Sequence, residues 1–215
     1  SSDVCSSDLR GALQEGFPYL TACIEAKGNI ANKGIAIRLA HNAAVCFDSD
    51  LLRMAFGWSG GYINPSGVSF DTGHGGHPTI IGDVVFQTKS VPGCADASGS
   101  FSDPRKVEPY GPIPQSQGRY DGLYVVGDDV VLAYTVLGTK IHEQPSAVEK
   151  DGQLAIVRTF QTEKASADIA LLICDVDGAT GEVKENIAAL AAGESLTLAG
   201  VAGAPTGVKL EVKDN

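Results

Sequence analysis

The sequence contains no run of about 18 apolar residues, so it offers no candidate for a transmembrane helix. Its first residues also lack the basic and then apolar pattern of a secretory signal peptide. Basic residues are few, 16 against 26 aspartates and glutamates, and they form no cluster. Because binding to phosphates needs clustered lysine and arginine, the net charge of −10 argues against nucleic acid and anionic membranes as partners.

Cysteine is scarce, and the five cysteines form neither a C-x-x-C pair nor a C-x-x-C-H motif. This excludes a zinc knuckle and covalently attached haem within these residues. Cys23, Cys46 and Cys174 lie in apolar, strand-like runs, where a thiol packs as a small apolar group, whereas Cys94 lies in a Pro-Gly loop. Buried free thiols are therefore favoured, and disulfide pairing remains the alternative.

The first nine residues, SSDVCSSDL, are what a common sequencing adapter encodes when it is translated. We therefore treat 1–9 as an artefact and 10–215 as a single all-β domain. Without Asp3 and Asp8 the net charge becomes −10 + 2 = −8, and Cys5 is removed as well. The natural N-terminus would then be missing, and we expect the chain to be a fragment of a longer polypeptide.

Helical periodicity is almost absent, and short β-like runs separated by turn residues dominate. Residues 43–47 and 52–58 flank a turn at Asp48-Ser49-Asp50 and are predicted to pair as a hairpin. In the second run Leu52, Met54, Phe56 and Trp58 alternate with other residues, which predicts one apolar face directed at a core. Further strands are expected at 22–26, 34–39, 68–70, 79–86, 140–143, 154–162, 169–176, 195–198 and 208–212, with a long ordered loop at 88–118 and a weakly helical composition only at 185–192.

The clearest hairpin joins 122–126 to 130–136 through a turn at Gly127-Asp128-Asp129. Both faces of its second strand are largely apolar, which predicts a central strand rather than an edge strand. The pattern as a whole indicates an antiparallel all-β fold. We expect a β-sandwich or a larger stacked-sheet, supersandwich-like architecture with long loops.

Three motifs resemble functional sites. Gly57-Trp58-Ser59-Gly60-Gly61 matches the G-x-S-x-G nucleophile elbow, but the Asn-Pro-containing sequence after it cannot open a helix, so a glycine-lined turn is favoured. Asp71, His74 and His77 lie in a glycine-rich loop and have the donor types of a zinc or iron site; hydrogen bonds across the loop are the alternative. Residues 175–182 resemble the start of a calcium loop without its full pattern, which favours a hairpin turn.

The densest group of aromatic and charged residues surrounds Arg53, Trp58 and Tyr62. Planar rings beside hydrogen-bonding side chains suit a sugar, so these three residues are candidates for ligand binding. The alternative is core packing, because Trp58 shares its parity with apolar neighbours and is expected to be mostly buried.

Several ordered segments between about 17 and 160 together resemble a bacterial domain of unknown function, family number 6797. The segments are NIANKGIAIRL (29–39), VCFDSDLLRMAFGWSGGYI (45–63), GVSFDTGHGGHP (67–78), SDPR (102–105), GPIPQSQGRYDGLYVVGDDVVLAYTV (111–136) and RTF (158–160). The resemblance implies the N-terminal part of large exported proteins that elsewhere carry c-type haem and dehydrogenase-like propeller modules. It supplies no catalytic residue.

These observations favour a non-catalytic structural or binding module of an exported bacterial multidomain protein, periplasmic or secreted, that packs against other domains of its own polypeptide. The alternative is a carbohydrate-active or metal-dependent enzyme domain that uses Asp71, His74 and His77. Carbohydrate is a further candidate partner. Enzymatic activity of these residues stays open, and the absence of such activity is favoured. The one candidate cofactor is a divalent metal ion at the loop that contains Asp71, His74 and His77.

Overall fold

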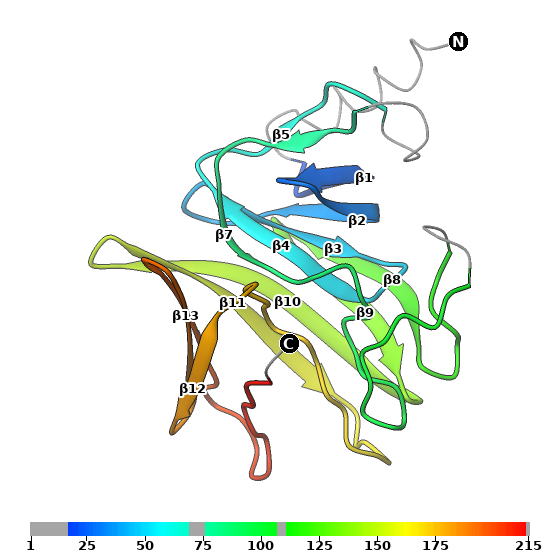
Figure 1. The fold of residues 1–215 in the computed structure, drawn as a ribbon. Helices are drawn as coiled ribbons and strands as arrows, with labels where there is room; N and C mark the ends of the chain where they lie inside the picture. Colours follow the sequence, from blue (N-terminus) through cyan, green and yellow to red (C-terminus); the bar gives the residue numbers. More distant parts are fainter. Residues whose placement is uncertain (1–16, 69–75, 107–110, 214–215) are drawn as a thin grey trace.

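The computed structural model describes residues 17–68, 76–106 and 111–213, and every regular element in them is a β-strand. The expected all-β fold is confirmed (Figure 1). Ser1–Leu9, read above as an artefact, lie outside the described residues. The strands are β1 (Tyr19–Ala26), β2 (Asn29–Arg38), β3 (Ala43–Asp48), β4 (Arg53–Ser59), β5 (Ile63–Asn64), β6 (Thr79–Ile80), β7 (Asp83–Gln87), β8 (Gly118–Val126), β9 (Asp129–Val136), β10 (Thr139–Lys150), β11 (Gln153–Thr162), β12 (Thr180–Lys184), β13 (Ile187–Ala192) and β14 (Ser195–Gly200).

The first seven strands form one curled sheet in the order β5-β6-β1-β2-β3-β4-β7. The link between β6 and β7 is only Ile81-Gly82, although these strands lie near opposite ends of the sheet. A side chain at Gly82 would lie 2.0 Å from the carbonyl oxygen of Ser59, so the tight link needs glycine there. The first core covers one face of this sheet and combines many alanines with a few large side chains, among them Ile24, Phe56 and Trp58.

The second core lies between the other face of the curled sheet and a four-stranded sheet in the order β11-β10-β9-β8. The curled sheet contributes side chains such as Ile37 and Phe47, and the four-stranded sheet contributes Leu132 and Tyr134. The rings of Phe47 and Tyr134 stack across the interface with their centroids 5.5 Å apart. Two sheets packed face to face through a shared core form the expected sandwich.

Strand β4 does not have the single apolar face that its sequence predicts. Cys46 pairs with Phe56, but Phe47 pairs with Met54, so Ala55 is an extra residue that forms a β-bulge. Because of this extra residue, the even-numbered residues before and after the bulge point to opposite faces of the sheet. As a result, Met54 belongs to the second core, whereas Phe56 and Trp58 belong to the first.

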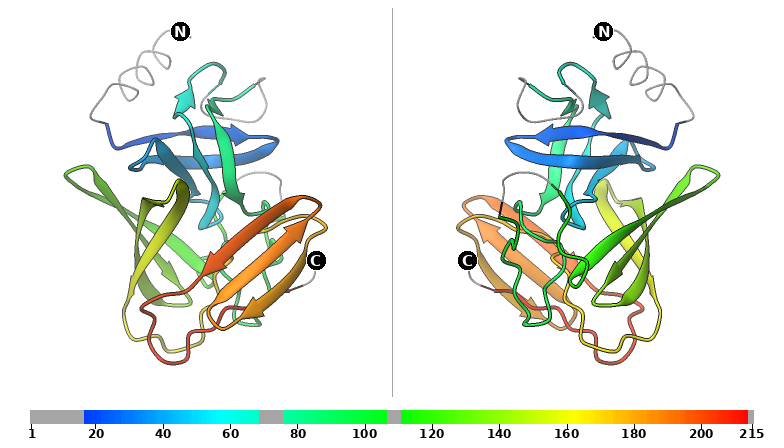
Figure 2. Two further views of the ribbon diagram at one scale, coloured as in Figure 1. Left: turned by 90° about the vertical axis from the view of Figure 1, so that its left-hand side faces the viewer. Right: turned by 90° about the vertical axis from the view of Figure 1, so that its right-hand side faces the viewer.

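The predicted hairpin is confirmed: β8 and β9 pair from Val126↔Asp129 onward and project from the body of the protein (Figure 2). In the four-stranded sheet β9 lies between β8 and β10, so it is a central strand as expected. Its residues Val130, Leu132 and Tyr134 are buried in the second core.

Residues 169–176 were expected to form a strand, but they are held by only one β-bridge, Cys94↔Leu171. They run against the beginning of the long loop, where the Leu172 amide donates to the Gly93 carbonyl at 2.9 Å and the Asp175 amide donates to the Gln87 carbonyl at 2.8 Å. We call the two segments 87–95 and 169–175 the strap. The expected loop is confirmed in its described part, since apart from that bridge no strand occurs from Thr88 to Gln117.

Gly93 fixes the strap to the curled sheet. A β-carbon at this position would lie 2.2 Å from the Leu52 carbonyl oxygen and 2.4 Å from the Arg53 α-carbon. We expect Gly93→Ala to lower the free energy of unfolding by about 1–3 kcal/mol, because backbone atoms must move to admit the methyl group. Urea melts check this, with Gly76→Ala as the control, since nothing lies within 4 Å of a β-carbon there. Equal midpoints for the two variants would contradict the close packing of the strap.

The remaining strands form a small sheet in the order β12-β13-β14, set to one side of the sandwich (Figure 2). The weakly helical reading of 185–192 was wrong, because Ile187–Ala192 is the central strand of this sheet. Pairing on both sides outweighs the modest helix propensity of an alanine-rich segment. Residues 208–212 form no strand, although Val212 lies beside Gly181 of β12. No helix in the described part of the chain could span a membrane.

Candidate functional site

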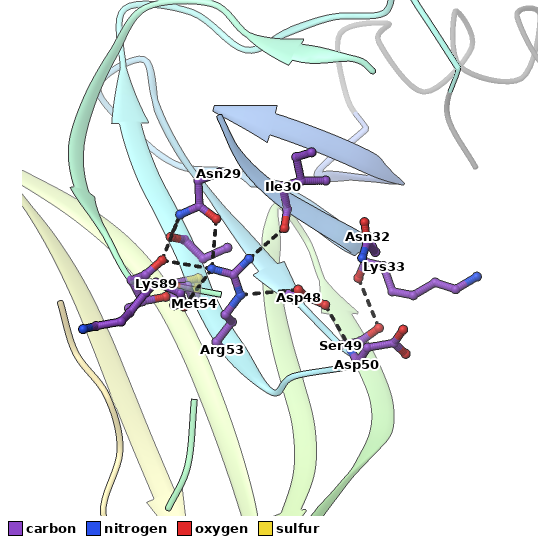
Figure 3. Close-up of polar contacts among 12 residues, drawn as sticks. Asn29, Ile30, Asn32, Lys33, Asp48, Ser49, Asp50, Arg53, Met54 and Lys89 are labelled. Atoms are coloured by element: carbon purple, nitrogen blue, oxygen red, sulfur yellow. Dashed lines mark hydrogen bonds and ion pairs between the residues drawn. The ribbon is translucent and has the colours of Figure 1, made fainter. Parts of the chain in front are cut away.

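Arg53, at the start of β4, is the centre of a buried polar network (Figure 3). Its guanidinium donates to the Ile30 carbonyl at 2.8 Å, to the Asn29 side chain at 3.0 Å and to the Thr88 carbonyl at 2.9 Å. It also donates to the Lys89 carbonyl at 3.1 Å. The network therefore joins β2, β4 and the strap, which are distant in the sequence.

The charge of Arg53 is balanced by Asp48 at the end of β3, with Nε 3.4 Å from the carboxylate. Both side chains are almost completely buried. Burial lowers the pKa of the Arg53 guanidinium, and the Asp48 carboxylate acts in the opposite direction. Among the described residues no buried side-chain nitrogen or oxygen lacks a hydrogen-bond partner, so the donors of Arg53 are used by the fold itself.

Trp58 and Tyr62 also meet each other inside the protein. Their rings stack with centroids 6.3 Å apart, and the indole of Trp58 donates to the carbonyls of Gly61 and Tyr62. The Tyr62 hydroxyl donates to the Ala36 carbonyl at 2.9 Å, and Arg38 lies over its ring. Burial raises the pKa of that hydroxyl, and Arg38 only partly offsets the shift. Trp58 and Tyr62 therefore pack together at the end of the first core, where β4 is followed by β5.

Arg53, Trp58 and Tyr62 are thus all buried, and they lie in two separate groups rather than around one surface. The expected burial of Trp58 is confirmed. Ligand binding by the three residues stays a prediction, and in this structure their polar groups and rings contact the protein.

The sequence patterns did not predict a second buried network, which is formed by Tyr134, Glu143 and Arg158. The hydroxyl of Tyr134 donates to Glu143 at 2.7 Å, and Arg158 donates to both oxygens of the same carboxylate. Arg158 also reaches the Leu172 carbonyl of the strap at 3.4 Å. The alternation of β10 does indicate the burial of Glu143, because Glu143 lies on the same face of the strand as the buried Ile141.

The electrostatics of this network favour the protonated forms of Tyr134 and Arg158. Burial raises the pKa of Tyr134 well above its usual value, and the Glu143 carboxylate raises it further. Burial acts to lower the pKa of Arg158, but Glu143 and Tyr134 more than compensate, so this pKa is raised. The ion pair and the neutral phenol together join β9, β10 and β11 to the strap.

The glycine-lined turn after Ser59 is present. Ser59 is the last residue of β4, and Gly60 follows it with a φ of +99°. No helix begins within the described residues 60–68, whereas a nucleophile elbow requires one.

His77 is the only member of the predicted metal-binding set in the described residues, because Asp71 and His74 lie outside them. Its ring is buried, and Nδ1 lies 2.9 Å from the Val68 carbonyl oxygen. A donor at Nδ1 leaves Nε2 with the lone pair that a metal would need, as is usual for metal-binding histidines. The metal site stays a prediction.

The metal hypothesis predicts a defined result. Purified protein that has been exposed to zinc and then desalted should retain about one metal ion per chain, and His74→Ala with His77→Ala should remove it. Elemental analysis by mass spectrometry checks the content. The control is His142→Ala, which changes a histidine on another sheet. Equal metal content in the double variant and the wild type would contradict the assignment.

The cysteines and the calcium-like segment 175–182 lie within the described residues. Cys23, Cys46 and Cys94 are buried, Cys174 is half-buried, and none of these four thiols forms a disulfide within the described residues. Burial raises the pKa of Cys94 to about 11. Of the calcium-like segment, Asp175 forms an ion pair with Lys89 at 3.2 Å and Glu182 lies in β12.

Comparison with known proteins finds a family model that matches the central part of the chain. The model of a family described as Domain of unknown function (DUF6797) matches residues 45–143. The match runs from β3 to the middle of β10 and includes Asp48, Arg53, Tyr134 and Glu143. It supports the resemblance to this family over the central part of the chain. No curated protein and no solved structure matches the chain.

Proposed function

We propose that the chain is a non-catalytic structural or binding module of an exported bacterial multidomain protein, periplasmic or secreted, that packs against other domains of its own polypeptide. The observation that carries the proposal is an open apolar face on the small sheet. The buried networks of Arg53 and Arg158 support it, because they use the conspicuous polar residues to join strands and strap.

The apolar part of this face is formed by β13 and β14, because β12 places the ion pair of Glu182 and Lys184 on the same side of the sheet. Ala189 pairs with Leu198 and Ala191 pairs with Leu196, so these residues share one side of the sheet with Ile187. The exposed fractions are 55% for Ile187, 62% for Leu196 and 63% for Leu198. Contiguous apolar residues at such exposure are typical of a surface that another protein segment covers.

Strand β14 adds an unprotected edge. It is the outermost strand of its sheet, and its sequence SLTLAG contains no charge and no proline. Within the described part of the chain, no backbone partner other than β13 pairs with it. Natural edge strands of soluble proteins are usually protected by lysine, proline or a bulge. A neighbouring domain of the same polypeptide that covers this edge and face would remove the need for such protection.

Limited proteolysis of the complete polypeptide tests the proposal. With Leu196→Lys and Leu198→Lys together, we expect cleavage in and around 180–213 to become at least tenfold faster, because the charges prevent packing of the neighbouring domain. Val126→Lys is the matched control, since Val126 is as exposed but lies at the tip of the β8–β9 hairpin. Unchanged cleavage in the double variant would overturn the proposal.

A further inference from the structure

The outer face of the four-stranded sheet is a second surface, distinct from the small sheet. Core-facing residues of β9 and β10, such as Leu132 and Ile141, alternate with residues that point to the opposite side. The register places Tyr124 beside Val131, and places Ala133, His142 and Gln161 in one row across three strands. We define the outer face by the outward residues Gly122, Tyr124, Val131, Ala133, His142, Gln144, Ser146, Val148, Ala155, Val157, Thr159 and Gln161.

This face carries no charged residue between its ends. None of its defined members is Asp, Glu, Lys or Arg, although the chain has 42 of these, 16 basic and 26 acidic. Solvated protein surfaces normally contain about 25–35% charged residues. At one end the face is bounded by Lys140 and by Arg119 and Asp121, which form an ion pair with each other at 2.6 Å. Asp129 lies beyond Tyr124, and Lys150 lies at the far end of β10. The middle of the face itself therefore offers no fixed charge, and its charged residues lie at the ends.

An exposed aromatic ring stands at one side of the face. The Tyr124 side chain is 58% exposed, and its ring lies 6.0 Å from the ring of His142 in a tilted arrangement. The residues across the strands beneath it are small, because Gly122 pairs with Ala133. The ring of Tyr124 is therefore accessible to a flat, weakly polar ligand surface.

Beyond the two rings the face offers hydrogen-bonding side chains without charge. His142 pairs with Gln161, and Gln144 pairs with Thr159, on neighbouring strands about 4.8 Å apart. Each amide supplies both donors and acceptors, and the hydroxyl of Thr159 supplies one of each. Gln161 and Thr159 are exposed, and Gln144 is half-buried. Such groups can match closely spaced hydroxyl groups on a ligand.

We propose that the outer face binds a neutral polysaccharide, with a sugar ring on Tyr124 and sugar hydroxyl groups on His142, Gln144, Thr159 and Gln161. A pyranose has an apolar C–H face and a rim of neutral donors and acceptors, which corresponds to the ring and amides found here. The inference does not depend on the packing of the small sheet, because the two surfaces share no residue. It also differs from the buried group of Arg53, Trp58 and Tyr62.

Native gel electrophoresis through polysaccharides tests the proposal on the 215-residue chain. The gels contain xylan, a mixed-linkage β-glucan, galactomannan or dextran, with polygalacturonate as the acidic comparison. We expect at least one neutral polymer to slow migration and polygalacturonate to have no effect. Tyr124→Ala should raise the dissociation constant at least tenfold, because it removes the sugar platform, and Gln144→Ala should raise it severalfold.

Phe17→Ala is the matched control, since Phe17 is an aromatic residue with a similar exposure of 50% that lies ahead of β1. It should leave migration unchanged, and all variants should keep the melting temperature of the wild type. Failure of every neutral polymer to slow the protein would overturn the proposal. Equal binding by Tyr124→Ala and wild type, equal retardation by polygalacturonate, or a change of oligomeric state in Tyr124→Ala would overturn it too.

Discussion

Replacing Arg53 with methionine is expected to lower the free energy of unfolding by about 3–5 kcal/mol. Methionine fills much of the same space but leaves the buried Asp48 carboxylate without its cation. It also removes the donor to the carbonyls of Ile30, Thr88 and Lys89. Each buried acceptor that loses its partner adds a desolvation cost, which is why the loss exceeds that of an ordinary hydrogen bond.

Urea melts followed by circular dichroism measure this effect. Arg119→Met is the matched control, because Arg119 forms a comparable ion pair with Asp121 but its side chain is 55% exposed. That variant should change the free energy of unfolding by less than about 1 kcal/mol. Asp48→Asn combined with Arg53→Met should cost less than the sum of the two single changes, because each removes the partner of the other. Equal, small effects for Arg53→Met and Arg119→Met would contradict a structural role for the buried network.

Truncation of Leu132 to alanine is expected to destabilise the protein by about 2–5 kcal/mol. Leu132 is completely buried in the second core, on the central strand β9, between the two sheets. The loss combines the transfer free energy of the removed methyl groups with the cost of the cavity that remains. Because strands pack on both sides of β9, the cavity cannot easily collapse.

Asp128→Asn provides the comparison for Leu132→Ala. Asp128 lies in the exposed turn of the same hairpin, and its replacement should change the free energy of unfolding by no more than about 0.5 kcal/mol. Both effects are read from urea melts. If the two variants had the same midpoint, β9 would not be part of the sandwich core.

The sequence predicted the strands best where alternation and turn chemistry agree. The hairpins β3–β4 and β8–β9 follow directly from local patterns, since short polar turns separate runs of apolar residues. The bulge at Ala55 could not be predicted, because nothing local distinguishes it from a regular strand residue. The strand at 187–192 was missed because its alanines favour a helix locally, whereas its partners β12 and β14 decide the outcome.

The sequence indicated which residues could form a site, but it did not indicate which of them lie together in the structure. Arg53 stands out beside Trp58 in the sequence, yet its partners Asn29 and Thr88 lie 24 and 35 positions away. Only the tertiary fold brings these groups together. The outer face around Tyr124 likewise depends on the register of four strands, which periodicity alone does not fix.

The central claim is that the small sheet is a docking surface for another domain of the same polypeptide. Hydrogen–deuterium exchange, compared between the 215-residue chain and the longer polypeptide that we propose contains it, tests this claim most directly. We predict that the amides of β13 and β14 exchange at least tenfold more slowly in the complete polypeptide, whereas those of β9 exchange at the same rate in both. Identical exchange of β13 and β14 in the two proteins would contradict the claim.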